Sequence, residues 1–126
     1  MEQRYLIDTN VIIDNFGNKL PTKAKEFLGH IEITISAVTK VEVLGWPGAT
    51  EQQLNPLYAF MELATILPIS EVVIDKTISI RQTKKIALGD ALIAATALVY
   101  DLVLISRNIS DFKNIDSLQL IDPHGL

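Results

Sequence analysis

The chain has 126 residues, with 15 Asp and Glu against 11 Lys and Arg, a formal net charge of −4, and no cysteine. Without cysteine it cannot use thiolate chemistry, hold an iron–sulfur cluster or depend on disulfides, and this composition is typical of a reducing compartment. Two histidines, His30 and His124, are too few and too far apart in sequence for a histidine-based zinc site.

Length and hydropathy predict a single domain over residues 1–126 and no association with a membrane. A chain of this size buries enough surface to fold without a disulfide or a structural metal. The longest strongly apolar run, residues 91–100, is about half the length of a membrane span. Acidic residues interrupt the N-terminal segment where a signal peptide would need an apolar stretch. We therefore expect a cytoplasmic protein.

The negative charge by itself argues against a nucleic-acid partner, because such proteins usually carry a basic face. If four acidic residues are committed to one site, however, the remaining balance is 15 − 4 = 11 acidic against 11 basic residues. Basic residues also cluster at Arg81, Lys84 and Lys85. The charge balance thus leaves an RNA partner open.

The first elements are predicted from apolar runs and from helix-ending residues. A short strand over residues 5–7 is expected to lead directly into a helix over about 10–16, which Gly17 ends. Pro21 suits the first turn of a second helix that ends near Gly29.

The middle of the chain is predicted to form a strand and two capped helices. Residues 31–35 alternate between apolar and polar side chains, which is typical of a strand. Ser36 can cap a helix that extends to about residue 44. Thr50 and Gln53 have capping-box spacing before a helix that reaches about residue 63.

The last part of the chain alternates strands and helices again. A strand over residues 66–69 precedes a helix that Ser70 can cap. Asp90 lies at the predicted start of a helix that is apolar nearly all round and should be central. Two further strands are expected over residues 102–105 and 118–121.

Strands that alternate with helices predict an α/β sandwich with a largely parallel central sheet of short strands. In such folds, ligands bind beyond the carboxyl ends of the strands. Asp8 follows the first strand, Glu42 lies on the helix after the second, and Asp111 follows the strand over residues 102–105. We therefore expect these acids and Asp90 to meet at one edge.

Each acid also has a simpler interpretation. Asp8 and Asp90 could cap or favour the start of a helix, where a negative charge is stabilising. Glu42 could belong to an exposed polar stripe of its helix, and Asp111 to a polar loop. Together, however, clustered carboxylates repel one another unless a cation lies between them. Oxygen ligands favour Mg²⁺ or Mn²⁺.

The order of these motifs resembles the PIN domain and, within it, the VapC toxins of type II toxin–antitoxin systems. The resemblance extends over essentially the whole chain. It rests on four segments: Leu6-Ile7-Asp8-Thr9-Asn10, Ile35-Ser36 to Glu42, Leu88-Gly89-Asp90 to Ala97, and Leu104-Ile105-Ser106-Arg107-Asn108 to Phe112.

The resemblance implies a PIN-like α/β/α sandwich and a Mg²⁺-dependent endoribonuclease, with Mn²⁺ as a substitute. A metal-activated water would hydrolyse the phosphodiester bond of RNA to a 3′-hydroxyl and a 5′-phosphate. It also implies a cognate antitoxin that blocks the acidic pocket, and a homodimer.

The resemblance assigns the metal and the catalysis to Asp8, Glu42 and Asp90. Many relatives have Asp where this chain has Asn108, so either the amide oxygen of Asn108 or the carboxylate of Asp111 would complete the site, around one metal or two. Thr9 and Ser106 match positions that orient ligands. From their charge, Lys84, Lys85 and Arg107 are candidates for holding the RNA backbone.

Three alternatives remain at this stage. A haloacid-dehalogenase-type phosphatase needs a second Asp where this chain has Asn10. A receiver-like binding module would require a lysine after its last strand, where Arg107 is a poor substitute. A PIN-like fold that binds without catalysis is the third alternative; Asn108 is the best argument for it, and the presence of Asp8, Glu42 and Asp90 is the argument against it.

Overall fold

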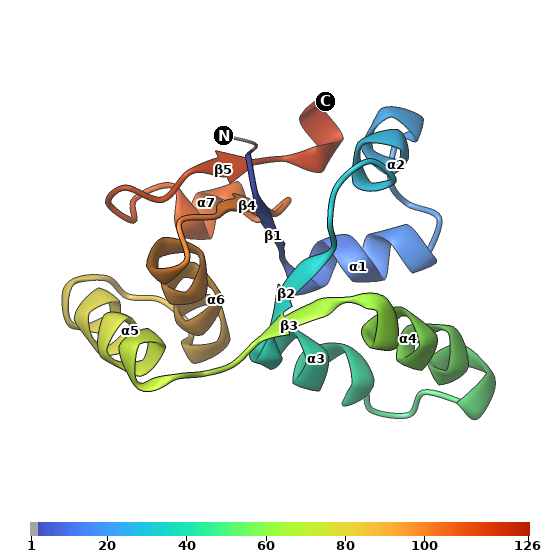
Figure 1. Ribbon diagram of the computed structural model, residues 1–126, viewed down its shortest axis with the longest axis horizontal. Coiled ribbons are helices and arrows are strands. Elements are labelled where there is room, and N and C mark those ends of the chain that lie inside the picture. The colour runs from blue at the N-terminus through green and yellow to red at the C-terminus, as the bar shows by residue number, and fades with distance from the viewer. Residues whose placement is uncertain (1–2) are drawn as a thin grey trace.

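Five short strands form the centre of the molecule in the computed structural model, which describes residues 3–126 (Figure 1). The strands are β1 (Tyr5–Ile7), β2 (Thr34–Ser36), β3 (Thr65–Leu67), β4 (Val103–Ile105) and β5 (Leu120–Ile121). One ladder has the order β1-β4-β5, a second joins β2 to β3, and every pairing is parallel. β2 lies beside β1, so the two ladders form one central layer. The predicted α/β class with parallel strands is confirmed.

Helices cover both sides of this layer. They are α1 (Thr9–Phe16), α2 (Thr22–Leu28), α3 (Ala37–Leu44), α4 (Glu51–Leu63), α5 (Glu71–Thr83), α6 (Leu88–Val99) and α7 (Ile109–Phe112), with a 3₁₀ helix at Pro123–Gly125. In Figure 1, α5 and α6 lie on one side of β1 and β2, while α1, α3 and α4 lie on the other. None of the helices within residues 3–126 has the length and apolarity that crossing a membrane requires.

The predicted caps are confirmed. Ser36 accepts from the amide of Val38, Ser70 accepts from the amide of Val73, and Thr50 forms a reciprocal capping box with Gln53. These side chains satisfy amides that lack a partner within the helix. They fix the starts of α3, α4 and α5 close to where the sequence predicts them.

Several predicted boundaries are wrong by one to three residues. β2 begins at Thr34 rather than at residue 31, because its partner strand β3 begins only at Thr65 and the two pair from there. β3 ends at Leu67, β4 begins at Val103 and β5 begins at Leu120, so each strand is shorter than predicted. The 3₁₀ helix at the C-terminus was not predicted. The predicted strands are too long because alternating hydrophobicity indicates only which side chains are buried. A residue is part of a strand only where a neighbouring strand pairs with it.

The start of α6 also differs from the prediction. Ala87 is its N-cap and the helix begins at Leu88, so Asp90 is the third helical residue rather than the first. Asp90 therefore lies within the first turn, where its charge still benefits from the helix dipole, but its side chain does not cap the helix.

Two apolar clusters hold the central layer in place. One contains Leu6 and Leu104 with buried residues of α5, α6 and α7, and the other contains Ile7 and Ile105 with buried residues of α1, α3 and α4. Neighbouring residues of β1 and β4 thus point to opposite faces, as strand geometry requires. The carboxyl ends of these strands are held between two packed layers, which makes them a rigid base for side chains.

Candidate active site

Asp8 lies at the end of β1 and caps α1. Its Oδ1 accepts from the amide of Thr9 at 2.8 Å, and its Oδ2 accepts from Ser106 Oγ at 2.7 Å and Asn10 Nδ2 at 3.0 Å. The residue is only 2% exposed. Both the capping and the site interpretations of Asp8 are therefore compatible with its position, because one oxygen serves the helix and the other faces β4.

A second set of hydrogen bonds fastens the segment after β4 to the start of α1. Asn10 Nδ2 lies 3.3 Å from Ser106 Oγ, and the amide of Arg107 donates to Asn10 Oδ1 at 3.3 Å. Ser106 Oγ also accepts from the amide of Asn108 at 2.9 Å. Ser106, which is fully buried, thus holds the Asp8 carboxylate and the following loop together. This linking role of Asn10 was not predicted from the sequence.

Glu42 projects from α3 toward the same edge. Thr9 Oγ1 lies 2.6 Å from Glu42 Oε1 and 3.2 Å from Thr39 Oγ1. A Cβ atom added at Gly89 would lie 3.0 Å from Glu42 Oε2, so the backbone at the start of α6 leaves room for this carboxylate. The side chain of Glu42 is exposed, but its hydrogen bond with Thr9 holds it in place. This contact distinguishes Glu42 from a polar helix residue that only faces solvent.

Asp90 is partly buried and lies near the other three acids, and both conditions raise its pKa. Burial, followed by the negative charges of Asp8, Asp111 and Glu42, raises the pKa of Asp90 to about 6 from the ordinary 3.8. Burial also raises the pKa of Asp8, with a further increase from Glu42, while its hydrogen bonds from Ser106, Thr9 and Asn10 oppose that rise. The four predicted acids thus lie close enough for their charges to repel one another, although they come from distant parts of the chain. We call this group, Asp8, Glu42, Asp90 and Asp111, the acidic edge.

Asn108 is the N-cap of the short helix α7, and Asp111 lies within that helix. Asn108 Nδ2 donates to Asp111 Oδ2 at 2.8 Å, so the amide group of Asn108 orients the carboxylate of Asp111. The amide oxygen of Asn108 is not used in that hydrogen bond. The structure therefore places both candidates for the fourth ligand side by side.

The donor set fits a hard divalent cation in its chemistry, because it offers carboxylate and amide oxygens. As the side chains stand in residues 3–126, no three Asp, Glu or His groups are placed so that they could hold one ion together. The acids therefore share an edge without forming a closed coordination shell. The repulsion acting on Asp90 is the feature that a bound cation would relieve.

A further acidic residue, Asp14 on α1, was not predicted as part of any cluster. It is 4% exposed, and its Oδ2 lies 2.7 Å from Arg107 Nε and 3.2 Å from His124 Nε2. A carboxylate that is buried this deeply needs a partner for its charge. Arg107, expected to be free for RNA, is instead paired through its Nε, and its side chain remains 51% exposed.

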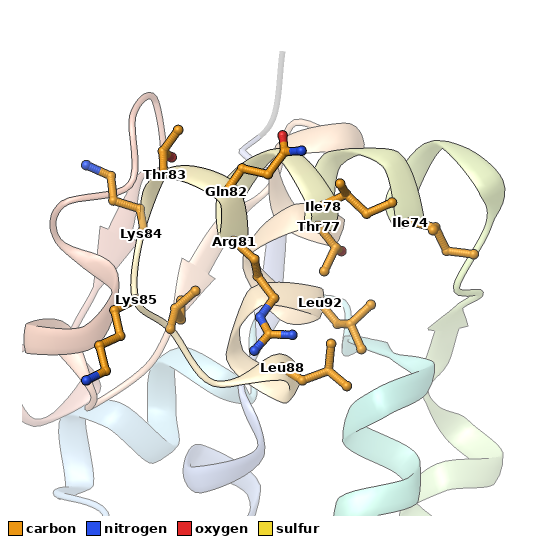
Figure 2. A pocket seen from close by; sticks show the side chains of 11 residues that line it. Ile74, Thr77, Ile78, Arg81, Gln82, Thr83, Lys84, Lys85, Leu88 and Leu92 are labelled. Atoms are coloured by element: carbon orange, nitrogen blue, oxygen red, sulfur yellow. The ribbon is translucent and has the colours of Figure 1, made fainter.

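Lys84 and Lys85 lie in the segment between α5 and α6, where they line a groove that has no acidic lining residue (Figure 2). The ion pairs within residues 3–126 both involve Asp14, so neither lysine is paired with the acidic edge. Within α6, Thr96 Oγ1 donates to the carbonyl of Leu92 at 2.8 Å.

The PIN domain model matches residues 5–118. The chain belongs to the PIN domain family. It is 32% identical over 125 residues to Ribonuclease VapC1 of Rickettsia felis, covering 92% of this chain and 93% of that protein. The predicted resemblance to the PIN domain and to VapC proteins is confirmed.

Solved structures of this PIN family show the same fold. A toxin–antitoxin complex from Klebsiella pneumoniae matches with a TM-score of 0.78 and 33% identity, covering 94% of this chain and 97% of the other. VapBC-1 from nontypeable Haemophilus influenzae matches with a TM-score of 0.81 and 26% identity, covering 96% of this chain and 98% of the other. The matches cover nearly all of each chain, so this chain and these relatives share the PIN fold over almost the whole of the aligned lengths.

Proposed function

We propose that this PIN protein is a metal-dependent endoribonuclease and the toxin of a toxin–antitoxin pair. Its relative in Rickettsia felis is named a ribonuclease, and the two structures above are toxin–antitoxin or VapBC assemblies. The observation that carries the proposal is the acidic edge. Acidic side chains from separate elements meet there, and within residues 3–126 no Lys, Arg or His forms an ion pair with them.

We assign metal binding to Asp8, Glu42 and Asp90, with Asn108 or Asp111 completing the site. When bound, Mg²⁺ or Mn²⁺ supplies a water of lowered pKa and neutralises charge on the attacked phosphate. Ser106 and Asn10 hold Asp8 in place, and Thr9 directs Glu42, which is positioned to hold the ion or to accept a proton from water.

The product chemistry follows from water being the nucleophile and the 3′-oxygen being the leaving group. Attack of water on phosphorus, with departure of the 3′-oxygen, leaves a 3′-hydroxyl and a 5′-phosphate and does not use the RNA 2′-hydroxyl. Single-stranded or looped RNA is the expected substrate, because its phosphates are accessible and its bases can move aside. The half-exposed guanidinium of Arg107, oriented by Asp14, is available to a neighbouring phosphate.

The proposed antitoxin has a suitable surface close to the acidic edge. A groove of about 620 Å³ lies between α1, α3 and α4, and Glu42 is one of its lining residues. Most of its other residues are apolar, including the exposed side chains of Ile13, Phe16 and Trp46. A partner segment with an apolar face would fill this groove and end over Glu42. A homodimer and a cytoplasmic location remain predictions.

The decisive experiment is cleavage of total RNA by the purified protein with Mg²⁺ or Mn²⁺, with a chelator as control. We expect Asp90→Asn to lose at least about a hundredfold in rate, as when a charge-stabilising group is removed from an active site. Asp75→Asn makes the same chemical change at an exposed position of α5 and should leave the rate unchanged.

The products should carry 5′-phosphates, which a 5′-phosphate-dependent exonuclease would detect. Equal cleavage by wild type and Asp90→Asn would contradict the assigned site. Metal binding without cleavage of any RNA would favour instead the PIN-like fold that binds without catalysis, the interpretation that Asn108 allows.

A further inference from the structure

The carboxylate of Asp14 joins two segments from the last part of the chain to α1. Its Oδ2 lies 2.7 Å from Arg107 Nε, in the segment that follows β4, and 3.2 Å from His124 Nε2, in the C-terminal 3₁₀ helix. Both nitrogens face an oxygen that can only accept, so both donate to it. The Asp14 side chain is 5% exposed, so these two contacts rather than solvent determine its orientation.

The segment that begins with Arg107 carries the last members of the candidate site. Asn108 follows directly, and its side chain orients Asp111 through a hydrogen bond of 2.8 Å. The amide of Arg107 donates to Asn10 Oδ1 at 3.3 Å, while its side chain contacts Asp14. Asn10 and Asp14 are four residues apart on α1, so they lie on one face of that helix. α1 therefore holds Arg107 by both its backbone and its side chain.

The C-terminal segment is held firmly enough to support this arrangement. The amide of Ser106 donates to the carbonyl of Ile121 at 3.0 Å, which ties the end of β4 to the residue after Leu120 in β5. The Asp122 side chain accepts from the amide of His124 at 2.9 Å and caps the 3₁₀ helix. These contacts fix the backbone that carries the His124 ring.

We propose that His124 and Asp14 are positioning residues of the metal site and that they act through Arg107. They fix the conformation of the segment that carries Asn108 and Asp111. This inference rests on the proposed metal site, and it adds the C-terminal 3₁₀ helix to the parts of the fold on which cation affinity depends. Groups that orient metal ligands without touching the metal commonly change its affinity by about 10–100-fold.

Charge and positioning predict opposite effects when these donors are removed. Arg107 is a cation next to Asn108, so by charge alone its loss would strengthen the binding of a divalent cation. His124 is neutral or positive, so by charge alone its loss would leave the affinity unchanged or raise it. Positioning predicts weaker binding in both cases, because the oxygens of Asn108 and Asp111 would no longer be held in place. The sign of the effect therefore separates the two causes.

The first measurement is Mn²⁺ binding by the metal-free full chain, followed through the electron paramagnetic resonance signal of free Mn²⁺. His124→Ala removes the ring, whereas His124→Gln keeps a nitrogen donor on a side chain of similar reach. Arg107→Gln removes the cation. His30→Ala is the matched control, because His30 is exposed and lines a pocket with Tyr5, at the amino end of β1, whereas Asp8 follows its carboxyl end.

We expect Mn²⁺ to bind at least about threefold more weakly to His124→Ala and about tenfold more weakly to Arg107→Gln, under conditions in which urea unfolding shows both to be folded. His124→Gln should recover most of the lost affinity, and His30→Ala should bind like the wild type. Cleavage should persist at saturating Mn²⁺. Equal or tighter binding by His124→Ala and Arg107→Gln would overturn the inference, as would an equal loss in His124→Ala and His30→Ala.

The second measurement tests the positioning without any cation. In the amide correlation spectrum of the metal-free protein, the backbone signals of Asn108 and Asp111 and the side-chain signal of Asn108 should shift in His124→Ala but not in His30→Ala. Such shifts, with no Mn²⁺ binding by the wild type, would support the positioning and contradict the metal site. Mn²⁺ binding by the wild type that is unchanged in His124→Ala and Arg107→Gln would contradict only the positioning.

Discussion

Asp8 caps α1 and Asp14 lies within it, and the two are almost equally buried, at 2% and 4% exposure, yet their surroundings are opposite. Asp14 contacts Arg107 and His124, so the protein supplies the groups that compensate its charge. Asp8 receives hydrogen bonds only from neutral groups and faces further carboxylates. A buried acid that is paired internally stabilises the fold, whereas a cluster of unpaired acids calls for a cation from outside.

Asp14→Asn should remove the ion pairs of residue 14 with Arg107 and His124. The free energy of unfolding should fall by about 1–2 kcal/mol, less than the about 3–5 kcal/mol for a fully buried ion pair, because Arg107 is half exposed. Metal-dependent RNA cleavage should persist. Urea unfolding of Asp14→Asn, Arg107→Gln and the double variant measures the coupling. Additive effects of the two substitutions would show that the pair does not stabilise the fold.

Asp90 should show the opposite behaviour when its charge is removed by pH. Its folded pKa of about 6 lies above the ordinary 3.8, so between these values the folded state binds more protons than the unfolded state. This group therefore adds stability as the pH falls from about 7 to 4, on the order of 1 kcal/mol after allowing for its partial exposure.

Urea unfolding at pH 7, 5 and 4 measures this contribution as the difference between wild type and Asp90→Asn. Asp90→Asn should be the more stable protein at pH 7 without metal, and saturating Mg²⁺ should stabilise only the wild type. Asp75→Asn should follow the wild type throughout. A pH-independent difference between wild type and Asp90→Asn would contradict the repulsion.

Gly89→Ala should have the smallest effect of these substitutions, because it only shifts the carboxylate of Glu42. The added Cβ would lie 3.0 Å from Glu42 Oε2, and the exposed Glu42 side chain can move away without damage to the core. Ala also favours helix by about 0.5–1 kcal/mol over Gly. We expect unchanged or higher thermal stability with several-fold slower RNA cleavage. Gly125→Ala, where a Cβ meets nothing within 4 Å, is the control. Full activity of Gly89→Ala would show that the position of Glu42 is unimportant.

The sequence by itself determined the fold class, the family and most of the helix boundaries. Caps such as Ser36, Thr50 and Ser70 act within a few residues, and the alternation of strands and helices restricts the topology, so local pattern was sufficient. The sequence also indicated that Asp8, Glu42, Asp90 and Asp111 share one edge, because parallel strands end on the same side. Their roles in metal binding and catalysis stay predictions.

Only the tertiary structure decided which charges are compensated. Asp14 and His124 are 110 residues apart, and their contact depends on where the C-terminal 3₁₀ helix packs. The same holds for Arg107, which pairs with Asp14, and for Gly89, which gives Glu42 its space. Local patterns extend over a few residues, whereas the neutralisation of a carboxylate depends on side chains brought together from distant segments by the packing of the core.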